Sequence, residues 1–226
     1  MTVDIILLPG LHGSIALFDT FVTLAPSWAR CRPIPLPAQS NQNFLALAEA
    51  IACPVQAVQR PVLLAESYSS LVAVHLTQLL GPDISLLVLC NPLLDGPSVV
   101  SPDLAATLVA SPLLPSWCAA YMMADGNRSV GCAMLREVRQ MPRQLLSDRI
   151  RVAAAARSAG TLSSLSVPLL ALIGRRDRLL SPSRARAALS LARDRSVIDI
   201  DAPHLIVQTH PSSVWLAISE RLQLPC

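Results

Sequence analysis

The chain has 226 residues, 52% of them hydrophobic, and a formal net charge of +3, with a mean hydropathy of +0.49. This length suits one domain, or one domain with an inserted segment, and buries enough surface to need no metal or disulfide. The charge is too small to favour nucleic acid as a partner, and all 18 basic residues are arginine, which excludes a Schiff base or a Ser-Lys dyad built from a lysine side chain.

Other sequence features bear on location and on cofactors. No apolar stretch approaches the roughly 18 residues of a membrane span, and no basic leader with a small-residue cleavage site is visible, so we expect a cytoplasmic protein. The six cysteines are scattered without a CxxC motif or a Cys/His cluster. They predict reduced, mostly buried thiols, and we expect no metal and no cofactor.

The first element is a short buried strand over residues 3–8, which ends at Pro9 and Gly10. Glycine lets the backbone of such a loop approach a reacting group, and the N–H of Leu11 is then placed to stabilise an oxyanion. His12 offers a possible base, but the two glycines explain the loop better. The alternative is an ordinary glycine-containing turn. A phosphate loop is excluded because the lysine-containing motif is missing.

A second, short strand is expected over 32–36 and a helix over 43–59, followed by a strand over 61–65 and a buried, apolar helix over 68–80. Between the last two lies Ala65-Glu66-Ser67-Tyr68-Ser69. A sharp strand-to-helix turn presents one side chain at its apex and needs small residues two positions before and after it. Ser67 is therefore the candidate nucleophile, and the Tyr68 N–H is the second oxyanion donor. The alternative is that Ser67 only caps the helix.

After a strand over 84–90, residues 91–166 contain no convincing strand, and their apolar residues follow helical spacing. Seventy-odd residues are too many for an ordinary crossover. We therefore expect two parts, a core formed by 1–92 and 167–226 and a helical cap formed by 93–166. The alternative is two helices that flank the sheet, joined by long loops.

Two further strands, over 167–173 and 197–200, precede helices over 183–192 and 211–222. Asp177 and His204 follow these strands by a few residues, at the sheet edge where open α/β folds bind ligands. A carboxylate there can orient the histidine that activates a serine. Asp177 could instead pair with Arg175, Arg176 or Arg178, and Asp95 is the reserve acid. Serine, aspartate and histidine in this chain order are typical of one serine-hydrolase architecture.

On these segments (residues 7–14, 62–69, 168–182 and 199–211) the chain resembles the α/β-hydrolase superfamily, and within it small carboxylesterases of the pimeloyl-acyl-carrier-protein methyl ester esterase type. It departs from them at Pro9, where relatives carry histidine, and at Ala65 and Ser69, where they carry glycine. The resemblance implies a minimal, mostly parallel sheet of about six strands flanked by helices, with a helical cap insertion.

The resemblance also implies hydrolysis of a carboxylic ester through an acyl-enzyme. The small-molecule substrate would have an apolar acyl group, held by cap residues Leu113, Leu114, Trp117, Met122 and Met123. A basic stretch of the cap, Arg128 to Arg157, could instead meet an acyl carrier protein, which favours a thioesterase or an esterase for carrier-bound substrates. A further alternative is a ligand-binding sensor with little turnover.

Overall fold

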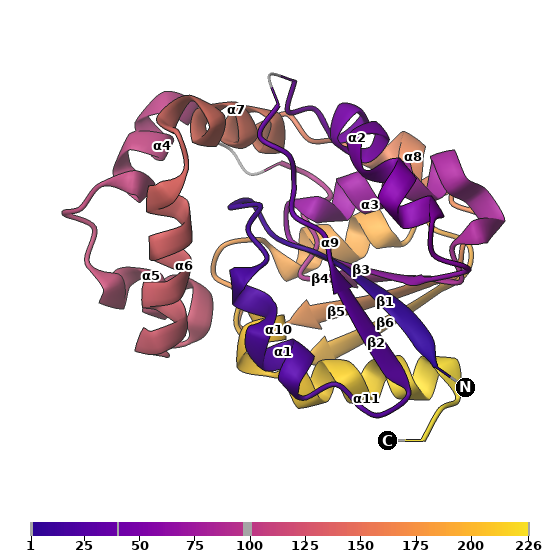
Figure 1. Cartoon of the computed structure of the whole chain (residues 1–226). Coiled ribbons are helices and arrows are strands. Elements are labelled where there is room, and N and C mark those ends of the chain that lie inside the picture. Colours follow the sequence, from indigo (N-terminus) through magenta and orange to yellow (C-terminus); the bar gives the residue numbers. More distant parts are fainter. Residues whose placement is uncertain (1, 40, 97–100, 226) are drawn as a thin grey trace.

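A computed structural model describes residues 2–39, 41–96 and 101–225 (Figure 1). Its centre is a six-stranded sheet of order β2-β1-β3-β4-β5-β6, in which each pair of neighbouring strands is parallel. The strands are β1 (Val3–Leu8), β2 (Ala29–Pro33), β3 (Val62–Glu66), β4 (Leu86–Cys90), β5 (Leu169–Gly174) and β6 (Arg195–Ile200). The prediction of a parallel sheet of about six strands is confirmed.

The second strand lies three residues earlier than predicted. Residues 3–7 of β1 pair with residues 29–33, and the chain then continues through Pro35 and Pro37. Proline has no N–H to donate, so it is tolerated on an edge strand but does not extend a ladder.

Helices cover both faces of the sheet (Figure 1). Successive strand residues point to opposite faces, so Leu63 packs in one apolar cluster and Leu64 in the other. The first cluster is completed by α2 (Phe44–Gln56), α3 (Ser69–Leu80), α8 (Ala159–Ser163) and α9 (Pro182–Leu189). The second is completed by α1 (Asp19–Thr23), α10 (Ile206–Thr209) and α11 (Pro211–Leu222), with the 3-10 turn Ala16–Phe18.

The long segment between β4 and β5 is helical, and in Figure 1 the strand arrowheads point towards it. It contains α4 (Pro102–Ala110), α5 (Ser116–Ala124), α6 (Arg128–Gln140) and α7 (Arg143–Ala154), which share a third apolar cluster. The described part of this segment contributes no strand to the sheet, and residues 97–100 of the predicted cap lie outside the described residues. Helix α8 contacts α3 and α9 instead and belongs to the layer on the sheet.

Two other predictions concern the whole chain. Within the described ranges, no helix combines the length and the apolar character needed to cross a membrane. The described cysteines are free thiols, but the expectation that most are buried is wrong. Cys90 in β4 is buried, whereas Cys53 and Cys132 are exposed on α2 and α6 because they lie on the solvent-facing sides of these helices.

Candidate active site

Ser67 occupies the turn between β3 and α3 with a φ of +50°, a left-handed conformation that is uncommon for residues other than glycine. Its N–H donates to the Cys90 carbonyl at 3.0 Å, and its carbonyl accepts from the Leu93 N–H at 3.1 Å. Ala65 and Ser69, the small residues on either side, are fully buried. Because α3 begins at Ser69, the positive end of the helix dipole lies at Ser67.

The structure brings together the three side chains that follow different strands. His204 Nε2 lies 3.0 Å from Ser67 Oγ, and His204 Nδ1 lies 2.7 Å from Asp177 Oδ2. Because a carboxylate only accepts, Nδ1 donates to Asp177 and Nε2 accepts the Ser67 hydroxyl. The other Asp177 oxygen accepts the N–H groups of Leu179 and Leu180 at 2.8 and 2.9 Å. The carboxylate is therefore fixed from both sides.

Asp177 does not use the arginines beside it. Arg176 and Arg178 reach across to Asp125 at the end of α5, with N–O distances of 3.2 and 3.1 Å. The guanidinium of Arg178 also lies over the Tyr121 ring, 4.3 Å from its centre. These contacts tie the loop that carries the acid to the helical segment and leave the carboxylate to the histidine.

The loop after β1 lies against Ser67. A Cβ added to Gly10 would stand 3.9 Å from the Ser67 Cβ, so the backbone there passes close to the serine. Among the described residues, the N–H groups of Leu11 and Tyr68 donate no hydrogen bond. Both groups predicted as oxyanion donors are thus unpaired within the described chain.

This loop is held on two sides. The Ser69 hydroxyl donates to the Pro9 carbonyl, and Arg149 of α7 donates from Nη1 to the Leu11 carbonyl at 2.8 Å. Gly13 has a φ of +74°, and a Cβ there would meet Arg149. Arg149 is 1% exposed, so its predicted place on the basic surface of the cap is wrong.

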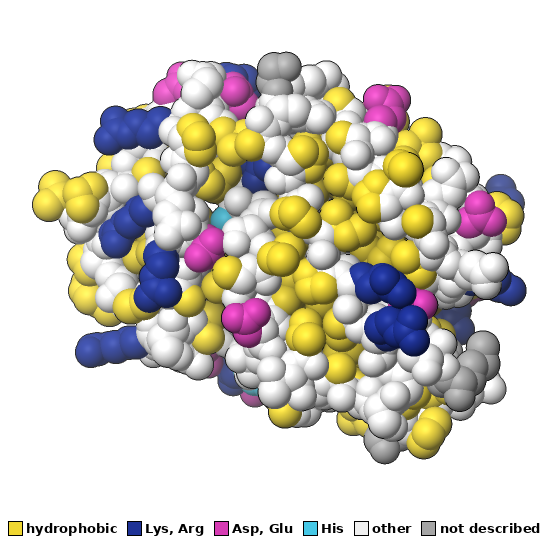
Figure 2. Space-filling view, viewed as in Figure 1, with side chains coloured by type: hydrophobic (Ala, Val, Ile, Leu, Met, Phe, Trp, Pro, Cys, Tyr) yellow, Lys and Arg dark blue, Asp and Glu magenta, His cyan; other side chains and the backbone are white. Residues whose placement is uncertain are grey.

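A cavity of about 250 Å³ opens beside Ser67, between the sheet edge and the helices α4 to α7. Figure 2 shows a hollow between these two parts of the molecule. Apart from Ser67, His204, Glu66 and His12, its side chains are apolar or aromatic: Leu11, Tyr68, Leu93, Val109, Met123, Met134, Val138, Ile150, Ala153, Leu179, Leu180 and Leu205. Such a wall suits a hydrocarbon group.

Of the five residues predicted to hold the acyl group, Met123 lines this cavity. Leu113, Trp117 and Met122 are exposed, Leu113 at 88%, and Leu114 packs at the edge of the helical cluster. These four residues do not line the cavity, so the prediction that they hold the acyl group is wrong. Helical spacing located α5, but the spacing does not tell which side of an apolar helix faces the sheet.

Two nearby carboxyl groups act on the pKa of His204. Burial alone would lower the pKa of His204, but the Asp177 carboxylate and, more weakly, Glu66 outweigh it, so the pKa is raised above its ordinary value. Glu66 is itself buried beside Ser67, which raises its pKa to about 7 despite a hydrogen bond of 3.0 Å from Gln208. Sequence reasoning did not identify Glu66, although its position next to the candidate nucleophile Ser67 was a signal.

Asn91 is a second residue that sequence reasoning missed. It is buried directly after β4, and its Nδ2 donates to the carbonyls of Pro203 and His204 at 2.8 and 2.7 Å. Its Oδ1 accepts the Gly174 N–H at 2.6 Å. Asn91 therefore fixes the histidine loop to the ends of β4 and β5, and a polar residue at the end of a buried strand was the available signal.

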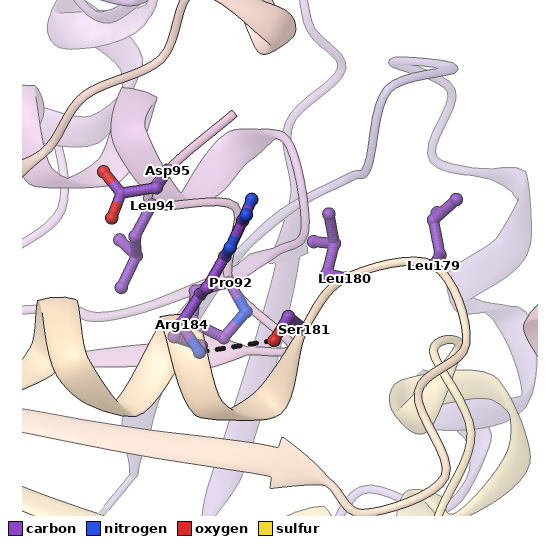
Figure 3. Close-up of a pocket in the computed structure, with 8 residues that line it drawn as sticks. Pro92, Leu94, Asp95, Leu179, Leu180, Ser181 and Arg184 are labelled. Carbon is purple, nitrogen blue, oxygen red and sulfur yellow. Dashed lines mark hydrogen bonds between the residues drawn. The ribbon is translucent and has the colours of Figure 1, made fainter. Parts of the chain in front are cut away.

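Asp95, the alternative candidate for the acid, does not contact His204 in the described structure. Asp95 lines a separate pocket of about 280 Å³ with Arg184 and Ser181 (Figure 3). Leu179 and Leu180 line both this pocket and the cavity beside Ser67. The carboxylate bonded to His204 is that of Asp177.

Sheet order, the serine turn and the placement of the acid and the histidine define the α/β-hydrolase fold, and solved structures agree. The chain is similar to a hydrolase from Oleispira antarctica, with a TM-score of 0.84 and 12% identity over 99% of this chain and 92% of that one. It is also similar to a thermophilic esterase from Thermogutta terrifontis and to the enol-lactonase from Burkholderia xenovorans LB400, both with a TM-score of 0.81 and 18% identity over 99% of this chain, covering 90% and 92% of theirs. No protein-family model and no curated protein matches the sequence.

Proposed function

We propose that this protein is a serine hydrolase that cleaves carboxylic esters with an apolar acyl group through an acyl-enzyme. The observation that carries the proposal is the chain of hydrogen bonds from Asp177 through His204 to Ser67, which lies in the wall of an apolar cavity. The esterase and the enol-lactonase of similar fold support it. In this proposal the helices α4 to α7 are the cap that covers the acyl group.

In the acylation step, Ser67 Oγ forms a bond to the ester carbonyl carbon while its proton passes to His204 Nε2. The negative charge moves to the carbonyl oxygen, where the N–H groups of Leu11 and Tyr68 stabilise it. Asp177 stays ionised and stabilises the imidazolium. The bond to the alcohol oxygen then breaks, and His204 returns the proton to the leaving alcohol.

In the deacylation step, water attacks the acyl-serine and gives its proton to His204. The acid product leaves when the bond to Ser67 Oγ breaks and this oxygen takes the proton back. The Ser67 proton therefore leaves with the alcohol, a proton from water restores the Ser67 hydroxyl, and one water is consumed for each ester.

A fluorophosphonate probe with peptide mapping tests the nucleophile. We expect one modified peptide, containing Ser67, and no modification of Ser67→Ala. Ser70→Ala is the matched control, because Ser70 is also buried and its hydroxyl has no partner within the described chain. Hydrolysis of p-nitrophenyl esters should follow the same pattern. A folded protein that neither reacts with the probe nor hydrolyses esters would contradict the proposal and favour a ligand-binding sensor.

A carrier-bound substrate is the second candidate, and one observation favours it. Arg128, Arg136 and Arg139 of α6 and Arg143 of α7 are exposed, and Figure 2 shows arginine side chains on the side of the molecule where α4 to α6 lie. An acidic carrier protein would meet this positive surface. Charge reversal at Arg136 and Arg143 should then slow hydrolysis of acyl-carrier substrates but not of p-nitrophenyl esters. If the variant hydrolyses acyl-carrier substrates as fast as the wild type, this second candidate is contradicted.

A further inference from the structure

His12 is a polar side chain of the cavity that the proposed mechanism leaves unused. It follows Leu11 in the loop after β1, and its Nδ1 lies 3.1 Å from the Ser14 N–H. A backbone N–H only donates, so Nδ1 accepts this bond and carries no proton. The ring proton of the neutral histidine is therefore on Nε2.

The Nε2 atom is buried and has no hydrogen-bond partner among the described residues. Gly10 shows where it lies: a Cβ added there would stand 3.8 Å from His12 Nε2 and 3.9 Å from Ser67 Cβ. The donor and the nucleophile thus flank the same point of the loop. The acyl chain of a substrate bound to Ser67 would lie in the cavity that His12 also lines.

His12 is an uncharged donor. Burial and then the Arg149 guanidinium lower its pKa to about 4, so the ring takes up no second proton near neutral pH. A nitrogen that already carries a proton cannot serve as a base. The wall around this N–H is mainly aliphatic, and a buried donor without an acceptor is unfavourable.

We propose that His12 determines specificity by donating its Nε2–H to an uncharged oxygen of the acyl chain, so that the preferred substrates are esters of oxo acids. This inference rests on the proposed hydrolase function and narrows its substrate class. A plain hydrocarbon chain leaves the donor unpaired, whereas a keto oxygen satisfies it. A carboxylate is disfavoured because the Glu66 side chain lines the same cavity.

The test compares methyl hexanoate with methyl 3-oxo-, 4-oxo- and 5-oxohexanoate. For at least one oxo position, we expect the wild type to have a kcat/KM about tenfold or more above that of methyl hexanoate. His12→Leu should bring this ratio down about tenfold, and His12→Gln, which keeps an N–H near the same place, should retain part of it. Comparing ratios between variants cancels the different intrinsic reactivity of the esters.

His75→Leu is the matched control, because His75 lies on α3 and does not line the cavity. It should leave all ratios as in the wild type. Equal ratios in the wild type and His12→Leu at every oxo position would overturn the inference. So would an equal slowing of all four esters in His12→Leu, since that result places His12 at the oxyanion or in the structure of the loop.

Binding separates this inference from the proposed function. In Ser67→Ala, calorimetry should show tighter binding of the preferred oxo ester than of methyl hexanoate, and the difference should vanish in the double variant with His12→Leu. If the wild type hydrolyses nothing but this binding difference persists, the hydrolase proposal fails and the role of His12 stands. If hydrolysis occurs and no binding difference exists, the role of His12 fails.

Discussion

Arg149 offers the sharpest test of how the helical segment supports the site. This buried side chain of α7 donates to four acceptors: the side chain of Gln42 at 2.8 Å and the carbonyls of Leu11, Leu36 and Pro37 at 2.8, 3.4 and 3.2 Å. Replacing it with methionine fills most of the same volume with an unbranched apolar chain. The change therefore removes the hydrogen bonds while leaving little empty space.

The expected cost follows from these contacts. Four hydrogen bonds at about 1 kcal/mol net each sum to ~4 kcal/mol. Part of this is recovered because Arg149→Met no longer buries a charge, so we expect a loss of about 2–4 kcal/mol. For a chain of this size that lowers the Tm by roughly 5–15 °C. The Leu11 peptide also loses its anchor, so kcat should fall by about tenfold, a fraction of the loss of one oxyanion donor.

Thermal unfolding measures the change in Tm, and p-nitrophenyl ester hydrolysis, at a temperature where each variant is folded, measures the change in kcat. Arg143→Met is the matched control, because Arg143 begins the same helix and is exposed; its Tm should change by no more than about 2 °C. If Arg149→Met melts within 2 °C of the wild type and keeps its kcat, the hydrogen bonds of Arg149 neither stabilise the fold nor position the loop, and the reasoning is refuted.

Four further predictions, on three variants, concern the surroundings of Ser67, His204 and Asp177. Burial raises the pKa of Glu66 from 4.5 to about 7, so wild-type stability falls as pH rises through this interval; Glu66→Gln should be more stable at pH 8 by about 3 kcal/mol in urea unfolding, and an unchanged pH dependence would contradict this. The same variant removes a negative charge that raises the pKa of His204, so the acidic limb of its kcat/KM profile should move to lower pH. An unmoved limb would show that Glu66 does not affect the pKa of His204. Asn91→Ala removes three hydrogen bonds, those to the Pro203 and His204 carbonyls and the one from the Gly174 N–H. We expect about 3 kcal/mol of lost stability in urea unfolding and at least a tenfold lower kcat; a wild-type kcat would show that the histidine loop needs no such anchor. Ser69→Gly removes the bond to the Pro9 carbonyl. The free-energy change calculated from the ratio of kcat values should exceed the loss of unfolding free energy calculated from the change in Tm, and parallel rate and melting measurements compare the two; an equal or smaller effect on kcat would contradict this.

The sheet and the triad were predictable because they depend on short-range rules. Central strands appear as apolar runs, since both of their faces are covered by helices. The carboxyl ends of parallel strands meet at one edge, so Asp177 and His204 could be placed near Ser67 because each follows a predicted strand by a few residues. The edge strand β2 was less well placed, because its prolines and its half-exposed side chains leave a weak pattern.

The parts that sequence reasoning missed depend on long-range contacts. In the sequence, Arg149 cannot be distinguished from the exposed arginines of the same stretch. Only the folded position of α7 reveals that it is buried. The cavity beside Ser67 is formed where α4, α5, α6 and α7 meet the strand ends. Their spacing predicts helices but not their orientation, so the exposure of Trp117 on α5 does not follow from the sequence pattern.

The residues at two departures from the common pattern, Pro9 and Ser69, are joined by one hydrogen bond. Where a serine replaces the small glycine of the turn, its hydroxyl is buried and needs an acceptor. The acceptor is the carbonyl of Pro9, and proline has no N–H and a fixed φ, which restricts this end of the loop. A glycine at position 69 would leave the turn intact but could not donate a hydrogen bond to the Pro9 carbonyl. Ser69 therefore joins the turn at Ser67 to the loop after β1 by a direct bond, and in the proposed mechanism this bond fixes the Leu11 N–H relative to the Tyr68 N–H.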